Sequence, residues 1–181
     1  KGADYVIAML HWGQEYATEP NQAQISLAKA LVEGGADLIL GHHPHVLQRG
    51  EIIRTVDPFS DTGDEKESFV MYSLGNFVSS QKGLERLSSL VLKVEVGIDY
   101  YSGEPYFKGA EYIPIYTQKK NKQGKYHFTV WPIEKALAEL EKENHNFPPD
   151  EAQALAKAWD HIVGSQPAMS PVKLEKLNDI Q

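Results

Sequence analysis

The sequence predicts a mixed α/β fold, and three observations carry that prediction. Near the amino terminus a strand, a helix and a second strand follow one another within about 40 residues, which is typical of a βαβ unit with parallel strands and a right-handed crossover. Between residues 51 and 131 several short apolar strands are separated by turn residues, which favours an antiparallel meander. From residue 132 onward the apolar residues show helical spacing instead.

The βαβ unit spans residues 5–41. Residues 5–10 and 37–41 are nearly continuous apolar runs, so each is predicted as a strand buried on both faces. The stretch between them, residues 20–35, is predicted as a helix, because Ile25, Ala28 and Val32 share one face and Gly34-Gly35 ends the pattern.

The later elements follow from alternation and from turn residues. Strands are predicted at residues 51–55, 68–74, 88–98, 106–116 and 126–131, with an exposed polar loop over 57–68. One helix begins near Pro132, and a second begins near Pro149 and ends at Gly164. We therefore divide the chain into an α/β part, residues 1–131, and a helical extension with a tail, residues 132–181.

Charge and composition exclude several classes of protein. The 181 residues contain 18 Lys and Arg against 25 Asp and Glu, a formal net charge of −7, which argues against a nucleic-acid or anionic-membrane surface. The basic cluster at residues 119–125 is predicted as the tip of a hairpin. Cysteine is absent, which excludes disulfides, Cys–zinc sites and thiol catalysis.

Histidines follow both strands of the βαβ unit. His11 comes after the first strand, and His42, His43 and His45 come after the second. Because functional groups of parallel sheets gather at the carboxyl ends of the strands, we expect His11, His43 and His45 to converge at one edge. Imidazole is a common metal ligand, so a metal or catalytic site is favoured over solvent-facing histidines. The remaining three, His127, His145 and His161, are expected to be structural or on the surface.

Other candidates lie beside these histidines. Asn76, after the strand at 68–74, is suited to bind a histidine, a phosphate or the loop backbone, or simply to form a turn with Gly75. Glu15 is placed to orient a ligand or to cap a helix. Four aromatic residues lie near the candidate site in the sequence, and we expect them either to line a pocket or to pack in the core. They are Trp12, Tyr16, Tyr72 and Phe77.

Three motifs together resemble the CapA family, also called PgsA, of bacterial capsule-biosynthesis proteins linked to poly-γ-glutamate synthesis and export. The motifs are residues 11–16, 41–46 and 72–77, and the likeness extends over about residues 1–118. The family is similar to calcineurin-like metallophosphoesterases, which implies an αββα sandwich with two divalent ions such as Mn, Zn or Fe. By that resemblance His11 and His43 would bind one metal and His45 the other, with His42 in the pocket beside them.

The resemblance also has a gap. The superfamily's amino-terminal Asp, Asp or Glu, and Asn-His motifs have no counterpart here, and we expect them to precede residue 1, so that this chain is the carboxyl-terminal part of the domain. Those motifs supply the bridging carboxylate and the general acid. We therefore expect weak or no metal binding and no catalysis from this chain alone.

The resemblance implies two functions of different classes. In the first, the whole protein is a metal-dependent hydrolase that acts on a phosphoester or a γ-glutamyl amide of the capsule polymer. In the second, it is a non-catalytic scaffold for the capsule synthase membrane subunits. Either way it is expected on the extracellular face of the bacterial membrane, held by an anchor outside this chain. The helices from 132 to 164 are a further candidate for contacts with synthase subunits.

Overall fold

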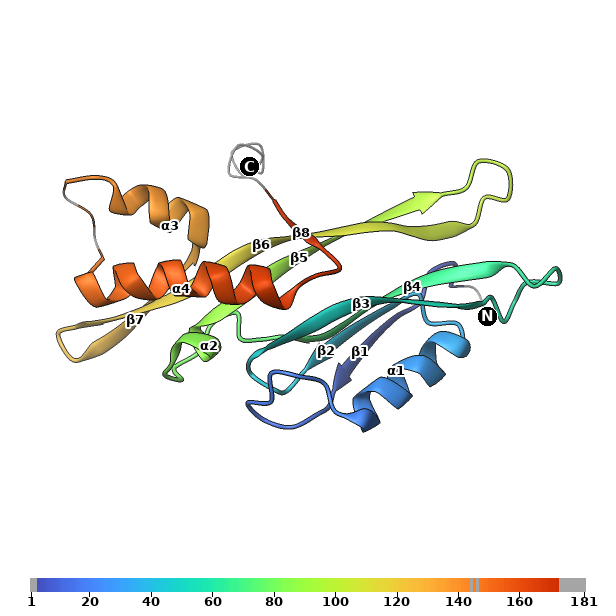
Figure 1. Cartoon of the computed structure of the whole chain (residues 1–181), viewed down its shortest axis with the longest axis horizontal. Helices are drawn as coiled ribbons and strands as arrows, with labels where there is room; N and C mark the ends of the chain where they lie inside the picture. The colour runs from blue at the N-terminus through green and yellow to red at the C-terminus, as the bar shows by residue number, and fades with distance from the viewer. Residues whose placement is uncertain (1–2, 144, 146, 173–181) are drawn as a thin grey trace.

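The computed structural model describes residues 3–143, 145 and 147–172, which form two β-sheets with helices packed against them (Figure 1). Sheet A has the strand order β1 (Ile7–His11), β2 (Leu38–His42), β4 (Glu65–Leu74) and β3 (Leu47–Val56). Sheet B contains β5 (Ser88–Ile98), β6 (Pro105–Lys122) and β7 (Lys125–Pro132), with the two-residue β8 (Ser170–Pro171) beside β6. The predicted mixed α/β class is confirmed, as is the parallel pairing of β1 with β2.

Four helices complete the described part of the chain: α1 (Gln22–Glu33), α2 (Leu84–Leu87), α3 (Ile133–Leu140) and α4 (Pro149–Ser165). The start of α1 is fixed by a capping box, in which Asn21 and Gln24 each accept a hydrogen bond from the other's backbone N–H. None of the described helices combines the length and the apolar character needed to cross a bilayer.

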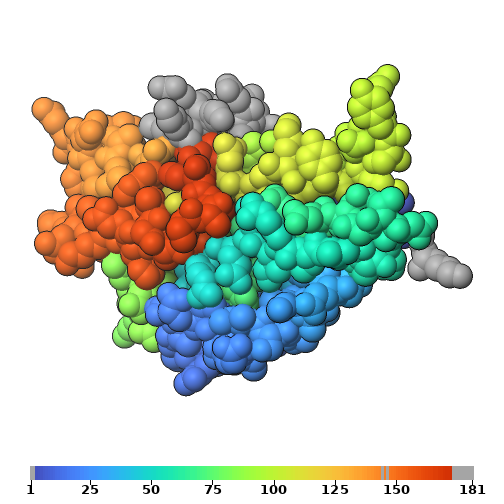
Figure 2. Space-filling model, turned by 45° about the vertical axis from the view of Figure 1, so that its right-hand side comes forward, coloured from blue at the N-terminus to red at the C-terminus, as the bar shows by residue number. Residues whose placement is uncertain are grey.

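The main core lies between the two sheets. Phe69 of β4 stacks on Phe107 of β6, with ring centroids 5.3 Å apart and planes 6° from parallel. Helices α3 and α4 add apolar side chains to the same core, and these are Ile133, Ala136, Leu155, Ala158 and Ile162. Figure 2 shows α4, in red, lying against the teal strand β3. The apolar faces of α3 and α4 are therefore used inside this chain.

A second, smaller core lies on the other face of sheet A. There Ala28 and Val32 of α1 pack on Ile39, Val70 and Tyr72. Strands β2 and β4 are thus covered on both faces, which explains their nearly continuous apolar sequences.

Strand β1 does not fit the prediction that it is buried on both faces. Its Ile7 and Met9 side chains are 54% and 70% exposed. The physical reason is position: β1 is an edge strand of sheet A, and the described part of sheet B does not extend over it. An apolar run alone does not distinguish an edge strand from a central one.

The predicted meander is correct only from β5 onward. Strands β3 and β4 form a hairpin inside sheet A, and β4 pairs in parallel with β2. The expected loop over 57–68 is shorter, because residues 65–68 pair with β3 and extend β4. Gly164 lies within α4 rather than at its end. The basic cluster does form a hairpin tip, with Gln123 and Gly124 at the turn between β6 and β7.

Candidate functional site

Three parallel strands end at the same edge of sheet A. His11 closes β1 and lies opposite His42 at the end of β2, while β4 ends at Leu74, just before Asn76. The position of β4 was not expected from the sequence, and it brings the motif at residues 72–77 to the histidines. We call the group His11, Glu15, His43, His45 and Asn76 the histidine rim.

Gly41 allows the close crossing that shapes this edge. The Trp12 indole Nε1–H reaches across β2 and donates to the backbone carbonyl of Tyr72, at 2.9 Å. A Cβ atom at residue 41 would overlap both that carbonyl and the indole. Trp12 also stacks on the Tyr72 ring and belongs to the α1-side core, so its observed role is packing.

The chain after β2 adopts backbone angles that side chains rarely take. His43 has φ +102° and His45 has φ +62°, and Tyr16 in the facing loop has φ +66°. Such angles cost about 1–3 kcal/mol each in non-glycine residues and concentrate at functional sites. The two loops are tied together by a hydrogen bond from the Tyr16 N–H to the Pro44 carbonyl, at 2.8 Å.

These strained loops bring potential metal ligands together. One ligand atom each from Glu15, His43 and His45 lies within 4.8 Å of the others. The His45 Nε2 atom is 3.9 Å from a Glu15 carboxylate oxygen. The His11 ring contacts the His43 ring, with centroids 4.4 Å apart. Two imidazoles and a carboxylate form a donor set suited to Zn, Mn or Fe.

Asn76 contacts the rim through its side chain. Its Oδ1 atom is 2.9 Å from His45 Nδ1. Its Nδ2 atom donates to Gln81 Oε1 at 3.1 Å and to the backbone carbonyl of Arg86 at 3.2 Å. Of the alternatives left open by the sequence, the structure shows two together, since Asn76 contacts both a histidine and the backbone of the segment that follows it.

The loop that carries Glu15 is held by a buried glutamine. Gln48 Nε2 donates to the carbonyls of Ala17 and Glu19, at 2.9 and 3.0 Å, and its Oε1 accepts from Gln24 Nε2 at 2.9 Å. Gln48 is completely buried, so these bonds form away from water. The sequence analysis missed Gln48, because a single polar residue at the start of a strand carries no distinctive pattern.

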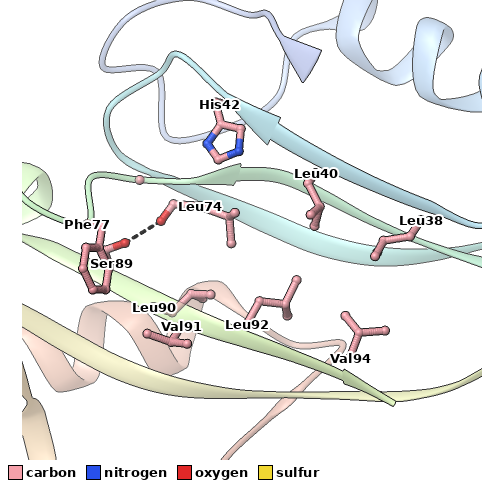
Figure 3. A pocket seen from close by; sticks show the side chains of 11 residues that line it. Leu38, Leu40, His42, Leu74, Phe77, Ser89, Leu90, Val91, Leu92 and Val94 are labelled. Atoms are coloured by element: carbon pink, nitrogen blue, oxygen red, sulfur yellow. Dashed lines mark hydrogen bonds between the residues drawn. The ribbon is translucent and has the colours of Figure 1, made fainter. Parts of the chain in front are cut away.

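His42 is not part of the metal-ligand group found among the described residues, although it pairs with His11. Its side chain lines a cavity of about 490 Å³ between the sheets, with leucine and valine side chains of β2 and β5 around it (Figure 3). The apolar lining includes Leu38, Leu40, Leu90, Leu92 and Val94. Glu15, His43 and His45 do not line this cavity, so the place expected for His42 in a pocket beside the metal ligands stays a prediction.

The other candidates lie in different settings. Tyr72 is buried and donates to Glu51 at 2.6 Å, and burial followed by this hydrogen bond raises its pKa. Phe77 is 60% exposed. The remaining histidines belong to other elements: His127 is on β7, His145 accepts from the Phe147 N–H, and His161 is on α4.

Comparison with known proteins matches the segment that carries the rim. Residues 1–81 match the model of a family described as bacterial capsule synthesis protein PGA_cap. Over 79 residues the chain is 46% identical to the capsule biosynthesis protein CapA of Bacillus anthracis, which covers 44% of this chain and 16% of that protein. Over 81 residues it is 44% identical to the PGA biosynthesis protein CapA of Bacillus subtilis (strain 168), which covers 45% and 18%. The chain thus matches less than one fifth of each relative, and the matches end before the predicted residue 118.

Proposed function

We propose that this chain, whose residues 1–81 match the bacterial capsule synthesis family, acts in the synthesis of a capsule polymer and that its histidine rim binds a divalent metal ion. The observation that carries the metal proposal is the convergence of Glu15, His43 and His45 within 4.8 Å. All three residues lie inside the matched segment. The polymer we propose is poly-γ-glutamate, in keeping with the names of the matched family and of the Bacillus subtilis relative.

The donors fit such an ion in number and in kind. His43 and His45 offer ring nitrogens and Glu15 offers a carboxylate oxygen, which together leave coordination positions for water or substrate. When bound, a divalent ion would lower the pKa of a water ligand and polarise a phosphoryl or carbonyl oxygen. The strained φ of His43 supports a functional role, since a merely structural turn would be less costly with glycine.

The chain's own residues would position this chemistry. The His11 ring contacts the His43 ring at a tilt of 44°, which limits the rotation of His43, and by the resemblance His11 is a further candidate ligand for the ion. Glu15 lies on the loop held by Gln48, so its carboxylate is kept opposite His45. The reaction we propose is hydrolysis of a phosphoester or of a γ-glutamyl amide in the whole protein.

The second candidate function is a non-catalytic scaffold. On this alternative the domain supports the membrane subunits of the synthase from the extracellular side of the membrane. The catalytic and the scaffold functions then differ in whether the histidines are needed.

Metal binding tests the first part of the proposal. Because three donors converge at the rim, we now expect this chain to bind a metal ion measurably, where the resemblance alone implied weak or no binding. Titration calorimetry of the metal-free chain with Zn²⁺ and with Mn²⁺ should therefore show saturable binding, which His43→Ala, His45→Ala and Glu15→Gln each weaken at least tenfold. The matched control is His127→Ala, which removes an exposed imidazole on β7 and should bind as the unaltered chain does. Equal affinity in all four variants would disprove a site at the rim.

Complementation separates the enzyme from the scaffold. A capsule-forming bacterium that lacks its corresponding protein would receive the full-length gene, either unaltered or with His11, His43 and His45 all changed to Ala. Restored capsule with the unaltered gene alone supports catalysis or metal dependence. Full rescue by the folded triple variant would establish the scaffold function instead.

A further inference from the structure

We propose that Asn76 is a positioning residue that fixes the tautomer of His45, so that the ring nitrogen facing Glu15 is an unprotonated electron-pair donor. This inference rests on the proposed function for its consequence, metal binding, but its structural part stands on hydrogen bonds alone. It assigns a role that the sequence left open among several alternatives.

The first step is the orientation of the Asn76 amide. An asparagine side chain has one acceptor oxygen and one donor nitrogen, and exchanging them by a 180° flip leaves the shape unchanged. Here the flip is excluded by the Arg86 backbone carbonyl, which can only accept and lies 3.2 Å from the nitrogen position. Gln81 adds a second acceptor on the same side, at 3.1 Å. Both N–H groups are therefore used, and Oδ1 points toward His45.

The second step is the proton on His45. Asn76 Oδ1 can only accept, so the contact of 2.9 Å to His45 Nδ1 is a hydrogen bond only if Nδ1 carries the hydrogen. A neutral imidazole has one N–H, so Nε2 is then unprotonated. The Arg86 carbonyl thus fixes the Asn76 amide, and the amide fixes the tautomer of His45. Histidine ligands of metals are commonly oriented in this way by a hydrogen-bond partner on the other ring nitrogen.

The third step is what Nε2 faces. It lies 3.9 Å from a Glu15 carboxylate oxygen, and a carboxylate only accepts. Two electron-pair donors held opposite one another are stabilised by a positive ion between them. His43 supplies the third donor of the same group. Asn76 therefore prepares His45 to bind a cation through Nε2.

The residues that anchor Asn76 also hold the far side of the rim. Gln81 Nε2 donates to the Tyr16 hydroxyl at 3.3 Å, and the Arg86 guanidinium lies over the Tyr16 ring, 5.0 Å from its centre. The Tyr16 ring in turn lies 6.1 Å from the His45 ring. The segment from 76 to 86 is thereby fastened to both loops of the rim, which keeps the amide from rotating.

Nitrogen NMR of the metal-free chain tests the proposal directly. Long-range ¹H–¹⁵N correlation spectra at about pH 8.5, above the ordinary imidazole range, distinguish a protonated from an unprotonated ring nitrogen. The His45 signals are assigned by their loss in His45→Gln. We expect protonated Nδ1 and unprotonated Nε2. Protonated Nε2 with unprotonated Nδ1 in the unaltered chain would overturn the proposal, and this reading needs no variant of Asn76 to fold.

Variants of Asn76 test how its loss changes the His45 tautomer and the Zn²⁺ affinity. Asn76→Ala removes the acceptor, so His45 should lose its fixed Nδ1–H form, and Zn²⁺ affinity should fall about 10- to 100-fold, the usual effect of losing such a partner. Asn76→Asp keeps an acceptor opposite Nδ1 and should keep the tautomer, but it loses both N–H bonds to Gln81 and Arg86, so its free energy of unfolding should fall. Gln81→Ala, which leaves the Arg86 anchor in place, should have the smaller effect. An unchanged tautomer in Asn76→Ala would overturn the positioning role.

The two proposals fail in different ways. If the unaltered chain shows the predicted tautomer but binds neither Zn²⁺ nor Mn²⁺, the metal site fails and the positioning role of Asn76 stands. If the chain binds metal while His45 shows the opposite tautomer, the metal site stands and the role of Asn76 fails.

Discussion

The two parts of the molecule contribute differently to the histidine rim. Residues up to 81 supply its histidines, Glu15 and Asn76, and they form the segment shared with the capsule proteins. Residues 82–172 supply the cover over the inner face of sheet A, together with the Arg86 carbonyl that orients Asn76. The candidate chemistry therefore lies in one stretch of sequence, whereas the core that stabilises it is completed by both.

The largest loss of stability is expected when the packing between the two parts is removed. Phe69→Ala removes a buried ring that stacks on Phe107, and such a deletion costs about 3–5 kcal/mol. We expect the free energy of unfolding in urea to fall by that amount. Fluorescence of Trp12 and of Trp131 should report one coincident transition, because each lies in a different part and both parts share the core.

A surface phenylalanine is the matched control. Phe59 lies in the β3–β4 loop and is 77% exposed, so Phe59→Ala should change the free energy of unfolding by less than about 1 kcal/mol. If Phe69→Ala were as mild as Phe59→Ala, the packing between the sheets would not be what stabilises the first part.

A second test stays within the first part. Gln48→Ala removes three hydrogen bonds and leaves Gln24 without its buried partner, which costs about 1–3 kcal/mol. Because the Glu15 loop is then released, Zn²⁺ affinity should also fall in calorimetry.

Gln22→Ala provides the comparison, since its exposed bond to Ser26 lies within helix α1 alone. Equal Zn²⁺ affinity in Gln48→Ala and Gln22→Ala would show that the Glu15 loop does not depend on Gln48.

Much of this arrangement followed from the sequence, and the exceptions have physical causes. The runs at Leu38–His42 and around Phe69 indicated buried strands, because only apolar residues suit a strand covered on both faces. The histidines were placed at the right edge, since they directly follow such strands. Local sequence does not say which sheet a strand joins, so the parallel neighbour of β2 was missed.

The role of Asn76 was undecidable for the same reason. Its partners, His45 and the Arg86 carbonyl, are 31 and 10 residues away and meet it only once β4 lies beside β2. The exposure of β1 was missed because it depends on what covers the strand. Tertiary neighbours decide both features, and a single sequence does not display them.

A third test compares the parts by pH. Burial, strengthened by Asp37, raises the pKa of Tyr5 to about 12, and burial, strengthened by Glu151 and Asp150, raises the pKa of Tyr116 to about 12. The protonated tyrosines therefore stabilise the folded state fully below pH 10, and this contribution is lost as the pH rises through 12.

At about pH 11 each shift is worth about 1 kcal/mol. Urea unfolding at pH 8 and pH 11 should show a smaller alkaline loss in Tyr5→Phe and in Tyr116→Phe than in the unaltered chain. Tyr101, which is 94% exposed, serves as the control. If only one of the two variants showed a smaller alkaline loss of stability, the two parts would unfold separately.

The smallest effect is expected from the Arg86 side chain. This test asks whether the side chain, in addition to the Arg86 carbonyl, helps to position the histidine rim. Arg86→Met keeps that carbonyl and removes the guanidinium from the Tyr16 ring, a contact worth about 0.5–1 kcal/mol. Arg54→Met, which breaks an exposed pair with Glu67 on the distant hairpin, is the matched control. We expect small losses of stability and unchanged Zn²⁺ affinity in both. A tenfold weaker affinity in Arg86→Met alone would place the Arg86 side chain among the groups that position the rim, because the carbonyl that orients Asn76 is the same in both variants.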